Sequence, residues 1–366
     1  MEEKKTTRQS NFELLRIIAM IMIVAHHFAY RSEMVFDTST ITAGRLWQQF
    51  LMYGGHIGLD VFVLISGYFL VDRTRLNLSK IARIWIMMFF YSVVIYAAII
   101  ATGTEVAFLD LYSDWVLIPA CTGVWDFASA YLGLMFAFPF INLLLHALSK
   151  NQYRLIIAVM LIFWSVLPTF FAKSFGCNYF LWLVALYTFA GYIKLYPEDF
   201  ARGKSFYRKW MFILWGLSLA SAVVLDVLGF KFEICATYAT HFSGMQHINI
   251  VLTAICMFLT FKEVKIGKKD GNSRIVNLVA SATFGVYLIH DNLLLSQWIW
   301  KQLFKNAEYT DKWWFIPASV GEILLVFAVC MVIELLRQNL LEKYYMKGVE
   351  KILSRPQAFI DRLMKQ

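Results

Sequence analysis

The chain has 366 residues, of which 59% are hydrophobic and only 16% are charged. Soluble domains average about 45–50% and about 25% for these classes, and the mean hydropathy of +0.58 also argues against a water-soluble enzyme. Disorder is excluded by the same composition. The net charge of +9 indicates membrane topology rather than a nucleic-acid partner, because the cytoplasmic loops of membrane proteins accumulate Lys and Arg.

Apolar stretches along the chain predict the fold class. A helix that crosses the hydrocarbon core of a bilayer needs about 20 apolar residues, and ten stretches approach that length. We therefore predict an all-α, polytopic membrane bundle of about ten transmembrane helices. In chain order the stretches lie at 12–31, 46–70, 82–102, 127–148, 154–172, 176–194, 210–230, 246–261, 275–296 and 313–336.

The positions of the basic residues predict the orientation of these helices. When the loops are assigned alternately to the two sides, 27 of the 34 Lys and Arg residues fall on the side of the two termini. The positive-inside rule then places both termini in the cytoplasm of a multi-pass protein of the cell membrane. The loop at 103–126 is expected outside, and it holds four acidic residues, one of them Asp126, and no basic residue.

Two segments are expected: an integral-membrane domain over 1–338 and a basic cytoplasmic tail over 339–366. The tail mixes apolar residues with Lys and Arg, which is typical of an interfacial amphipathic helix, and Pro356 is expected to interrupt it. The five cysteines are scattered without a CxxC pair. They predict apolar packing rather than a zinc site or a disulfide framework.

The first apolar stretch carries the most informative polar residues. Arg16 and His27 are eleven positions apart, so they share one face of a helix and lie about 16 Å apart along its axis. Imidazole titrates near neutral pH, so His27 is a candidate general base or acyl carrier. Alternatively, Arg16 extends to the headgroups and His27 only forms a hydrogen bond within the bundle. His26 points about 100° away.

Other polar residues give further candidates. Asp60, in the second stretch, is expected to orient His27 or another histidine, or to cap a loop at the outer surface. Gly58, Ser66 and Gly67 permit close helix approach there. Lys80 and Arg83 lie on one face at the inner end of the third stretch, where they either hold phosphates or simply set the topology.

A third group of residues is predicted near the outer ends of the helices. Trp125 and Asp126 precede the fourth stretch, and His241 and His247 flank the start of the eighth. These residues either line a polar cavity that opens outward or are ordinary interfacial contacts. The strongest candidates of this kind follow one another near the end of the ninth stretch: Tyr287, His290 and Asp291.

Four segments together resemble the bacterial integral-membrane acyltransferase family 3. The opening segment LLRIIAMIMIVAHH has the basic residue, ten intervening positions and histidine of this family, as Arg16 and His27. The others are GLDVFVLISGYFL, WDFASAYLGLMFAFPFIN and TFGVYLIH. The chain departs from the family at Lys80, where the first of two arginines is usual. Lysine keeps the charge but lacks the bidentate fork of arginine.

The resemblance implies an O-acetyltransferase that moves an acyl group, usually acetyl, from acyl coenzyme A to a hydroxyl of a surface or exported polysaccharide. It implies that His27 is catalytic and that Arg16 and Arg83 bind the acyl coenzyme A. We add Asp60 as a predicted catalytic partner of His27, and Lys80 as a predicted donor contact beside Arg83. Acetyl coenzyme A is then a co-substrate. Neither a bound cofactor nor a metal is expected. The expected partners are membrane lipid, a glycan acceptor and polysaccharide-assembly proteins. The residues expected to line the acceptor side are Trp125, Tyr287, His290 and Asp291.

The main alternative is a proton-coupled transporter or flippase of a glycan or small metabolite. Ten spans with buried Arg, His and Asp also describe that class. A membrane sensor that binds an acyl donor without turnover is a further alternative. Only an enzyme consumes the thioester.

Overall fold

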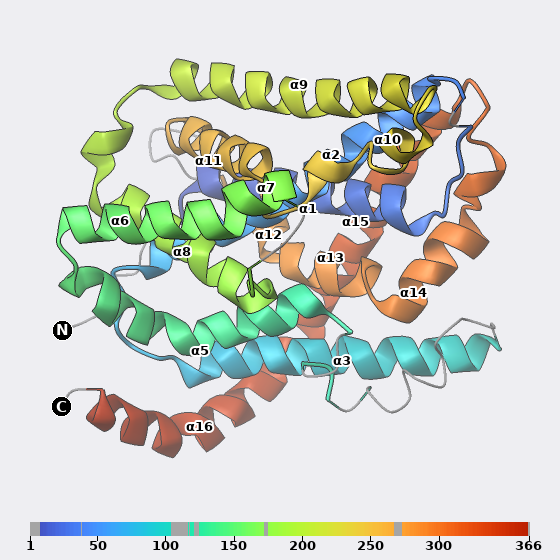
Figure 1. The fold of residues 1–366 in the computed structure, drawn as a ribbon. Helices are drawn as coiled ribbons and strands as arrows, with labels where there is room; N and C mark the ends of the chain where they lie inside the picture. Colours follow the sequence, from blue (N-terminus) through green and yellow to red (C-terminus); the bar gives the residue numbers. More distant parts are fainter. Residues whose placement is uncertain are drawn as a thin grey trace.

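The computed structural model describes residues 8–37, 39–103, 116, 118–120, 124–171, 175–266 and 273–364. Every regular element within these ranges is a helix, which confirms the predicted all-α class. Several of the long helices run side by side, whereas α15 (Phe315–Arg337) crosses them obliquely, and both chain ends lie at one end of the bundle (Figure 1). Most of the predicted outer loop at 103–126, together with Cys121, lies outside the described residues.

Most helices of the first half of the bundle are long. They are α1 (Ser10–Arg31), α2 (Ala43–Leu70), α3 (Leu78–Thr102), α5 (Asp126–Ala147), α6 (Lys150–Leu161), which continues through a π-helical turn into α7 (Leu167–Phe171), and α8 (Tyr179–Leu195).

The second half is more irregular, because several of its helices are short or bent. Its elements are α9 (Lys204–Gly229), α10 (Glu233–Thr237), the 3-10 turn η3 (His241–Ser243), α11 (Ile248–Lys262), α12 (Arg274–Ser281), α13 (Thr283–His290), α14 (Leu293–Gln297), α15 (Phe315–Arg337), the π-helical turn η6 (Gln338–Glu342) and α16 (Lys343–Leu363).

Each of the ten predicted apolar stretches falls on a helical segment. Within the described residues, eight helices are long and apolar enough to cross a membrane, and a ninth crossing is formed if the pair Arg274–His290 and Leu293–Glu308, bent by 75°, counts as one. The remaining stretch is α8, an apolar helix of 17 residues. The total of ten crossings and the cytoplasmic location of both termini stay predictions.

Helices α1 and α2 form the buried centre of the bundle, and glycines let them approach closely. A Cβ atom at Gly58 would lie 2.6 Å from the carbonyl oxygen of Ala19, and one at Gly55 would lie 2.1 Å from the Cβ of His26. On the other side of α2, a Cβ at Gly67 would lie 2.9 Å from the Cβ of Ala190 in α8. The predicted close approach at Gly58 and Gly67 is therefore confirmed, and it places α1 within the protein rather than in lipid.

The C-terminal helix packs against the start of α3. Arg75 forms two hydrogen bonds to the Asp361 carboxylate, at 3.0 and 2.8 Å. The Gln357 side chain bonds both the carbonyl oxygen of Leu76 and the backbone N–H of Leu78. The prediction that Pro356 interrupts the tail is wrong, because Pro356 lies inside α16. Its ring costs one backbone hydrogen bond, but the contacts of the next residue hold this turn on α3.

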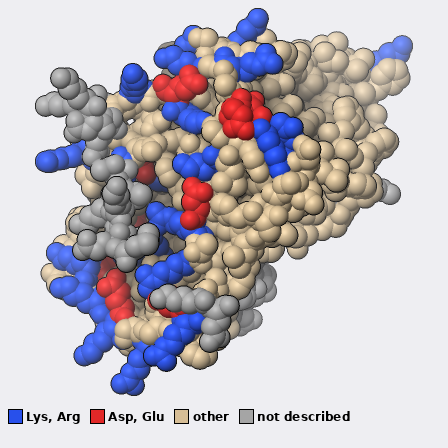
Figure 2. Space-filling view, turned by 90° about the vertical axis from the view of Figure 1, so that its left-hand side faces the viewer, with Lys and Arg blue, Asp and Glu red and all other residues tan. Residues whose placement is uncertain are grey.

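The boundary predicted at 338/339 falls within one helical run, because α15 passes through η6 directly into α16. Beyond it, the tail leaves apolar side chains exposed, as an interfacial helix does; among them are Ile352, Phe359 and Leu363. Lys and Arg gather on the face of the molecule that carries both chain ends (Figure 2).

Candidate active site

The side chain of His27 meets two residues of the ninth stretch where α1 packs against α13. The Nδ1 atom of His27 lies 2.9 Å from the Nε2 atom of His290. Its Nε2 atom lies 3.4 Å from Oδ1 of Asp291. These contacts join residues more than 260 positions apart in the chain. The structure thus brings His27, His290 and Asp291, three of the predicted site residues, into one cluster.

The hydrogen bonds define which nitrogen of His27 can accept a proton. The Nδ1 atom of His290 lies 2.6 Å from the carbonyl oxygen of Val286, and a carbonyl only accepts, so this nitrogen carries the proton of the neutral ring. The Nε2 atom of His290 then accepts a hydrogen bond from Nδ1–H of His27. The lone pair of neutral His27 is left on Nε2, the atom that faces Asp291.

Arg31 and Tyr287 complete the surroundings of Asp291. An Arg31 guanidinium nitrogen lies 3.1 Å from Oδ1 of Asp291, and the Tyr287 hydroxyl also interacts with this carboxylate. The positive charge of Arg31 stabilises the ionised carboxylate, and an ionised Asp291 stabilises an imidazolium at His27. Arg31 was missed in the sequence, although it follows His27 by four positions and so shares its helix face.

Asp60 does not form the predicted pair with His27. It is fully buried inside α2, and its Oδ1 atom accepts a hydrogen bond of 3.1 Å from Nε1 of Trp182 in α8. Within the described residues, Oδ2 of Asp60 has no partner. The carboxylate beside His27 belongs to Asp291 instead, because α13 rather than this part of α2 packs on the His27 face of α1.

The predicted donor-binding residues occupy two places. Arg16 forms a 2.7 Å ion pair with Glu13 and lies over the ring of Phe62. Lys80 and Arg83 lie in the first turns of α3, and Arg83 contacts Glu342 at 3.3 Å.

Lys80 and Arg83 share a groove of about 280 Å³ between α3 and α16. Arg16 is not among the residues that line it. The lining is rich in groups that can bind phosphate oxygens, with Glu350 as its acidic member: Arg75, Asn77, Ser79, Lys80, Arg83, Glu350 and Gln357. The groove is therefore a cationic site with a carboxylate at its edge, and its far wall is the C-terminal helix.

Another predicted cavity residue, Trp125, lies at the start of α5, close to α13. Trp125 is buried directly before α5, and within the described residues its Nε1 atom has no hydrogen-bond partner. Phe127, two positions later, packs edge-on against the ring of Tyr287 at 5.4 Å. The start of α5 therefore lies beside the helix that carries His290. Among the described residues, no cluster of His, Cys, Asp and Glu has the arrangement of a metal site.

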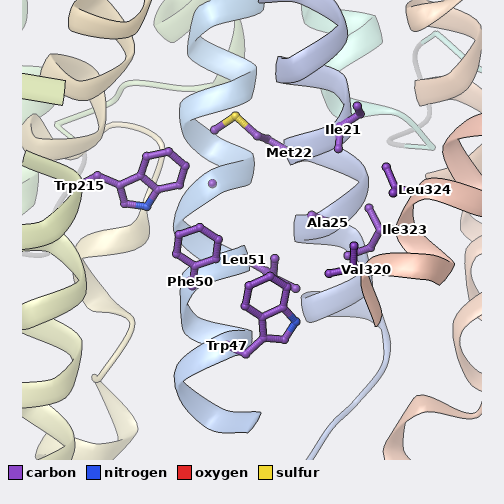
Figure 3. A pocket seen from close by; sticks show the side chains of 11 residues that line it. Ile21, Met22, Ala25, Trp47, Phe50, Leu51, Trp215, Val320, Ile323 and Leu324 are labelled. Atoms are coloured by element: carbon purple, nitrogen blue, oxygen red, sulfur yellow. The ribbon is translucent and has the colours of Figure 1, made fainter. Parts of the chain in front are cut away.

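A separate apolar pocket of about 220 Å³ lies between α1, α2, α9 and α15 (Figure 3). Aromatic rings of Trp47, Phe50 and Trp215 stack along it, and Ala25 forms part of the α1 wall. Because Ala25 and His27 are two positions apart, their side chains point roughly 200° apart on α1. This pocket is therefore on the opposite side of α1 from the His27 cluster.

Comparison with known proteins identifies the family. A family model described as an acyltransferase domain matches residues 9–335, a range that includes α1 to α14 and most of α15. No curated protein and no solved structure matches the chain. The matched range contains His27, Arg31, Lys80, Arg83, His290 and Asp291. The chain therefore belongs to this acyltransferase family, and its apolar helices make it a multi-pass membrane acyltransferase.

Proposed function

We propose that this chain, in the cell membrane, transfers an acetyl group from acetyl coenzyme A to a hydroxyl of a cell-surface or exported polysaccharide. The observation that carries this proposal is the arrangement around His27. The Nδ1 contact with His290 leaves the lone pair of neutral His27 on Nε2, so this atom can take a proton from a hydroxyl nucleophile. The Asp291 carboxylate beside the same atom would stabilise the imidazolium that forms.

The proposed reaction begins with proton transfer from the acceptor hydroxyl to Nε2 of His27. The hydroxyl oxygen attacks the thioester carbonyl, and the tetrahedral intermediate expels the thiolate of coenzyme A. The thiolate then takes the proton from the His27 imidazolium, so His27 returns to its neutral form. Asp291 stabilises the imidazolium while it exists, and Arg31 holds the carboxylate in place.

The donor is proposed to enter from the end of the bundle that carries the chain termini. The groove cations Lys80 and Arg83 would bind its phosphates, with the guanidinium of Arg83 as the bidentate contact. Arg16 lies on α1 about 16 Å from His27 along the helix axis. We expect Arg16 to contact the arm of the donor between the groove and the imidazole.

The proposal is tested with purified protein in nanodiscs, acetyl coenzyme A and deacetylated envelope oligosaccharide. We expect thioester loss that depends on the oligosaccharide, and acetyl groups on the recovered glycan. A transporter or a sensor would leave the thioester intact. Thioester loss without acetylated glycan would contradict the proposed acceptor and would leave the family assignment unchanged.

A further inference from the structure

Six of the seven histidines lie in one part of the bundle, and the His27 chemistry uses only two of them. From His27 the rings continue to His26, at a centroid distance of 5.6 Å, and from His26 to His56 in α2, at 4.6 Å. His56 then bonds the carbonyl oxygen of Ser243 in η3. The remaining two members, His241 and His247, lie on either side of Ser243 with their rings 4.9 Å apart.

Backbone carbonyls determine the hydrogen-bonding role of His26 and His56. The Nδ1 atom of His26 lies 2.9 Å from the carbonyl oxygen of Met52, and that of His56 lies 2.6 Å from the carbonyl oxygen of Ser243. A carbonyl oxygen only accepts, so both Nδ1 atoms carry the proton of the neutral ring. In each ring the Nε2 atom is left as a hydrogen-bond acceptor.

These Nε2 acceptors lack a donor in the part of the chain that the structure describes, where each ring forms only the bond through Nδ1. His56 is partly exposed, and 8% of the His26 surface is exposed. The backbone of Gly55 lies against the Cβ of His26 and fixes the ring relative to α2. His26 and His56 therefore present two fixed lone pairs beside the catalytic imidazole.

A ligand at these two rings must supply hydrogen-bond donors and carry no positive charge, because no carboxylate of the described residues contacts either ring. Neighbouring hydroxyl groups of a sugar satisfy this requirement. Tyr30 adds a suitable surface for the C–H face of a sugar ring, because its ring stacks on His26 at 6.0 Å and is 60% exposed.

We propose that His26 and His56 bind hydroxyl groups of the acceptor sugar next to the hydroxyl that reacts at His27. This inference rests on the proposed function and names the residues that select the acceptor. His26 and His56 are binding residues here, and the proton transfer remains with His27.

The test compares two replacements of His56. Asparagine places its amide nitrogen near the position of Nδ1, so His56→Asn keeps a donor for Ser243 and loses the Nε2 acceptor. Glutamine reaches the position of Nε2, so His56→Gln keeps an acceptor there. The matched control is His146→Asn, which replaces the seventh histidine, a residue bonded to the carbonyl oxygen of Val71.

Binding is measured without donor, from the tryptophan fluorescence of nanodisc-embedded protein titrated with deacetylated envelope oligosaccharide. We expect His56→Asn to raise the Kd about fivefold, the effect of one lost hydrogen bond. We expect His56→Gln and His146→Asn to stay within about twofold of the unchanged chain. His26→Asn, which keeps the bond to Met52, should act as His56→Asn does.

Equal Kd values for the unchanged chain and His56→Asn would overturn the inference, and so would an equal loss in His56→Asn and His56→Gln. Absence of oligosaccharide binding to the unchanged chain would also contradict it. A different result would contradict the proposed function and not this inference. In that case the oligosaccharide binds with the expected order of Kd values, but no acetyl transfer is detected.

Discussion

At the scale of single residues, the position of Asp291 decides how His27 can work. The carboxylate lies 3.4 Å from Nε2 of His27 and 3.1 Å from the Arg31 guanidinium. A negative charge at this point lowers the free energy of the imidazolium that forms when His27 takes a proton. The Arg31 contact keeps that charge in place. Asp291 is thus a positioning and stabilising residue for the proton acceptor.

Replacement of this carboxylate tests its role. Asp291→Asn keeps the size of the side chain and removes the charge that stabilises the imidazolium at His27, so we expect kcat for acetyl transfer to fall by about 100-fold. The measurement is steady-state acetyl transfer to oligosaccharide at saturating donor. Asp37→Asn, at a residue that bonds Ser39 outside the spans, is the matched control. A kcat within twofold of the unchanged chain would remove Asp291 from the reaction.

Part of this site could be predicted from the sequence, because helical periodicity shows which residues share one helix face. Arg16 and His27 share a helix face, and helical periodicity alone reveals that. The partner of His27 depends on which helices pack together across the bundle, which periodicity cannot reveal. The sequence therefore leaves Asp60 open between orienting a histidine and capping a loop, whereas the structure places it against Trp182 and brings Asp291 to His27.

At the scale of elements, the contact of α16 with α3 joins the C-terminal tail to the cationic groove. Arg75 and Asp361 form two hydrogen bonds, and Gln357 bonds the backbone on both sides of the α3 N-terminus. The acidic residues Glu350 and Asp361 face the cations at the start of α3. Because α16 forms the far wall of the groove, the position of this wall depends on the hydrogen bonds that attach α16 to the start of α3.

Loss of the Arg75 pair should loosen this helix without unfolding the bundle. An exposed ion pair contributes about 0–1 kcal/mol, so we expect Asp361→Asn to raise amide hydrogen exchange over residues 343–363 a few-fold. Exchange in α1 and α2 should not change. Arg355→Ala, on the exposed side of the same helix, is the control. Unaltered exchange over 343–363 in Asp361→Asn would show that the pair does not hold α16.

The membrane-spanning helices could be predicted from the sequence, because a lipid bilayer constrains their length and composition. Apolar stretches of about 20 residues reveal membrane helices because every backbone group must be satisfied within the helix. The 75° bend after His290 and the continuation of α16 through Pro356 escaped prediction. The continuation depends on contacts with another helix, since the Gln357 bonds to α3 hold the turn after the proline. At the bend, the Asn292 side chain caps the start of α14.

At the scale of the whole molecule, the close contact of α1 and α2 positions His27 relative to the histidine proposed to bind the acceptor on α2. α1 carries His26 and His27, and α2 carries His56, so a change in their spacing would move all three. Gly58 permits the contact because it has no Cβ atom, and the backbone oxygen of Ala19 occupies the space where a Cβ would lie.

A side chain at Gly58 should therefore disrupt the bundle. Its Cβ would lie 2.6 Å from that oxygen, and overpacking of this kind costs about 1–3 kcal/mol or more. We expect Gly58→Val to lower the Tm of the protein in detergent, measured by loss of the monodisperse peak in size-exclusion chromatography after heating. Gly321→Val, where a Cβ meets open space, should leave the Tm nearly unchanged. Equal Tm values for the two variants would contradict this account of the α1–α2 contact.

The most direct test of the central claim replaces His27 itself. Acetyl transfer from acetyl coenzyme A to envelope oligosaccharide is measured for the unchanged chain, His27→Ala and His27→Gln, each shown by size-exclusion chromatography to be folded in nanodiscs. If His27 is the general base, both variants lose about 100-fold or more of the transfer rate, and both still bind coenzyme A. Transfer at the unchanged rate in folded His27→Ala would contradict the assignment of His27 as the proton acceptor.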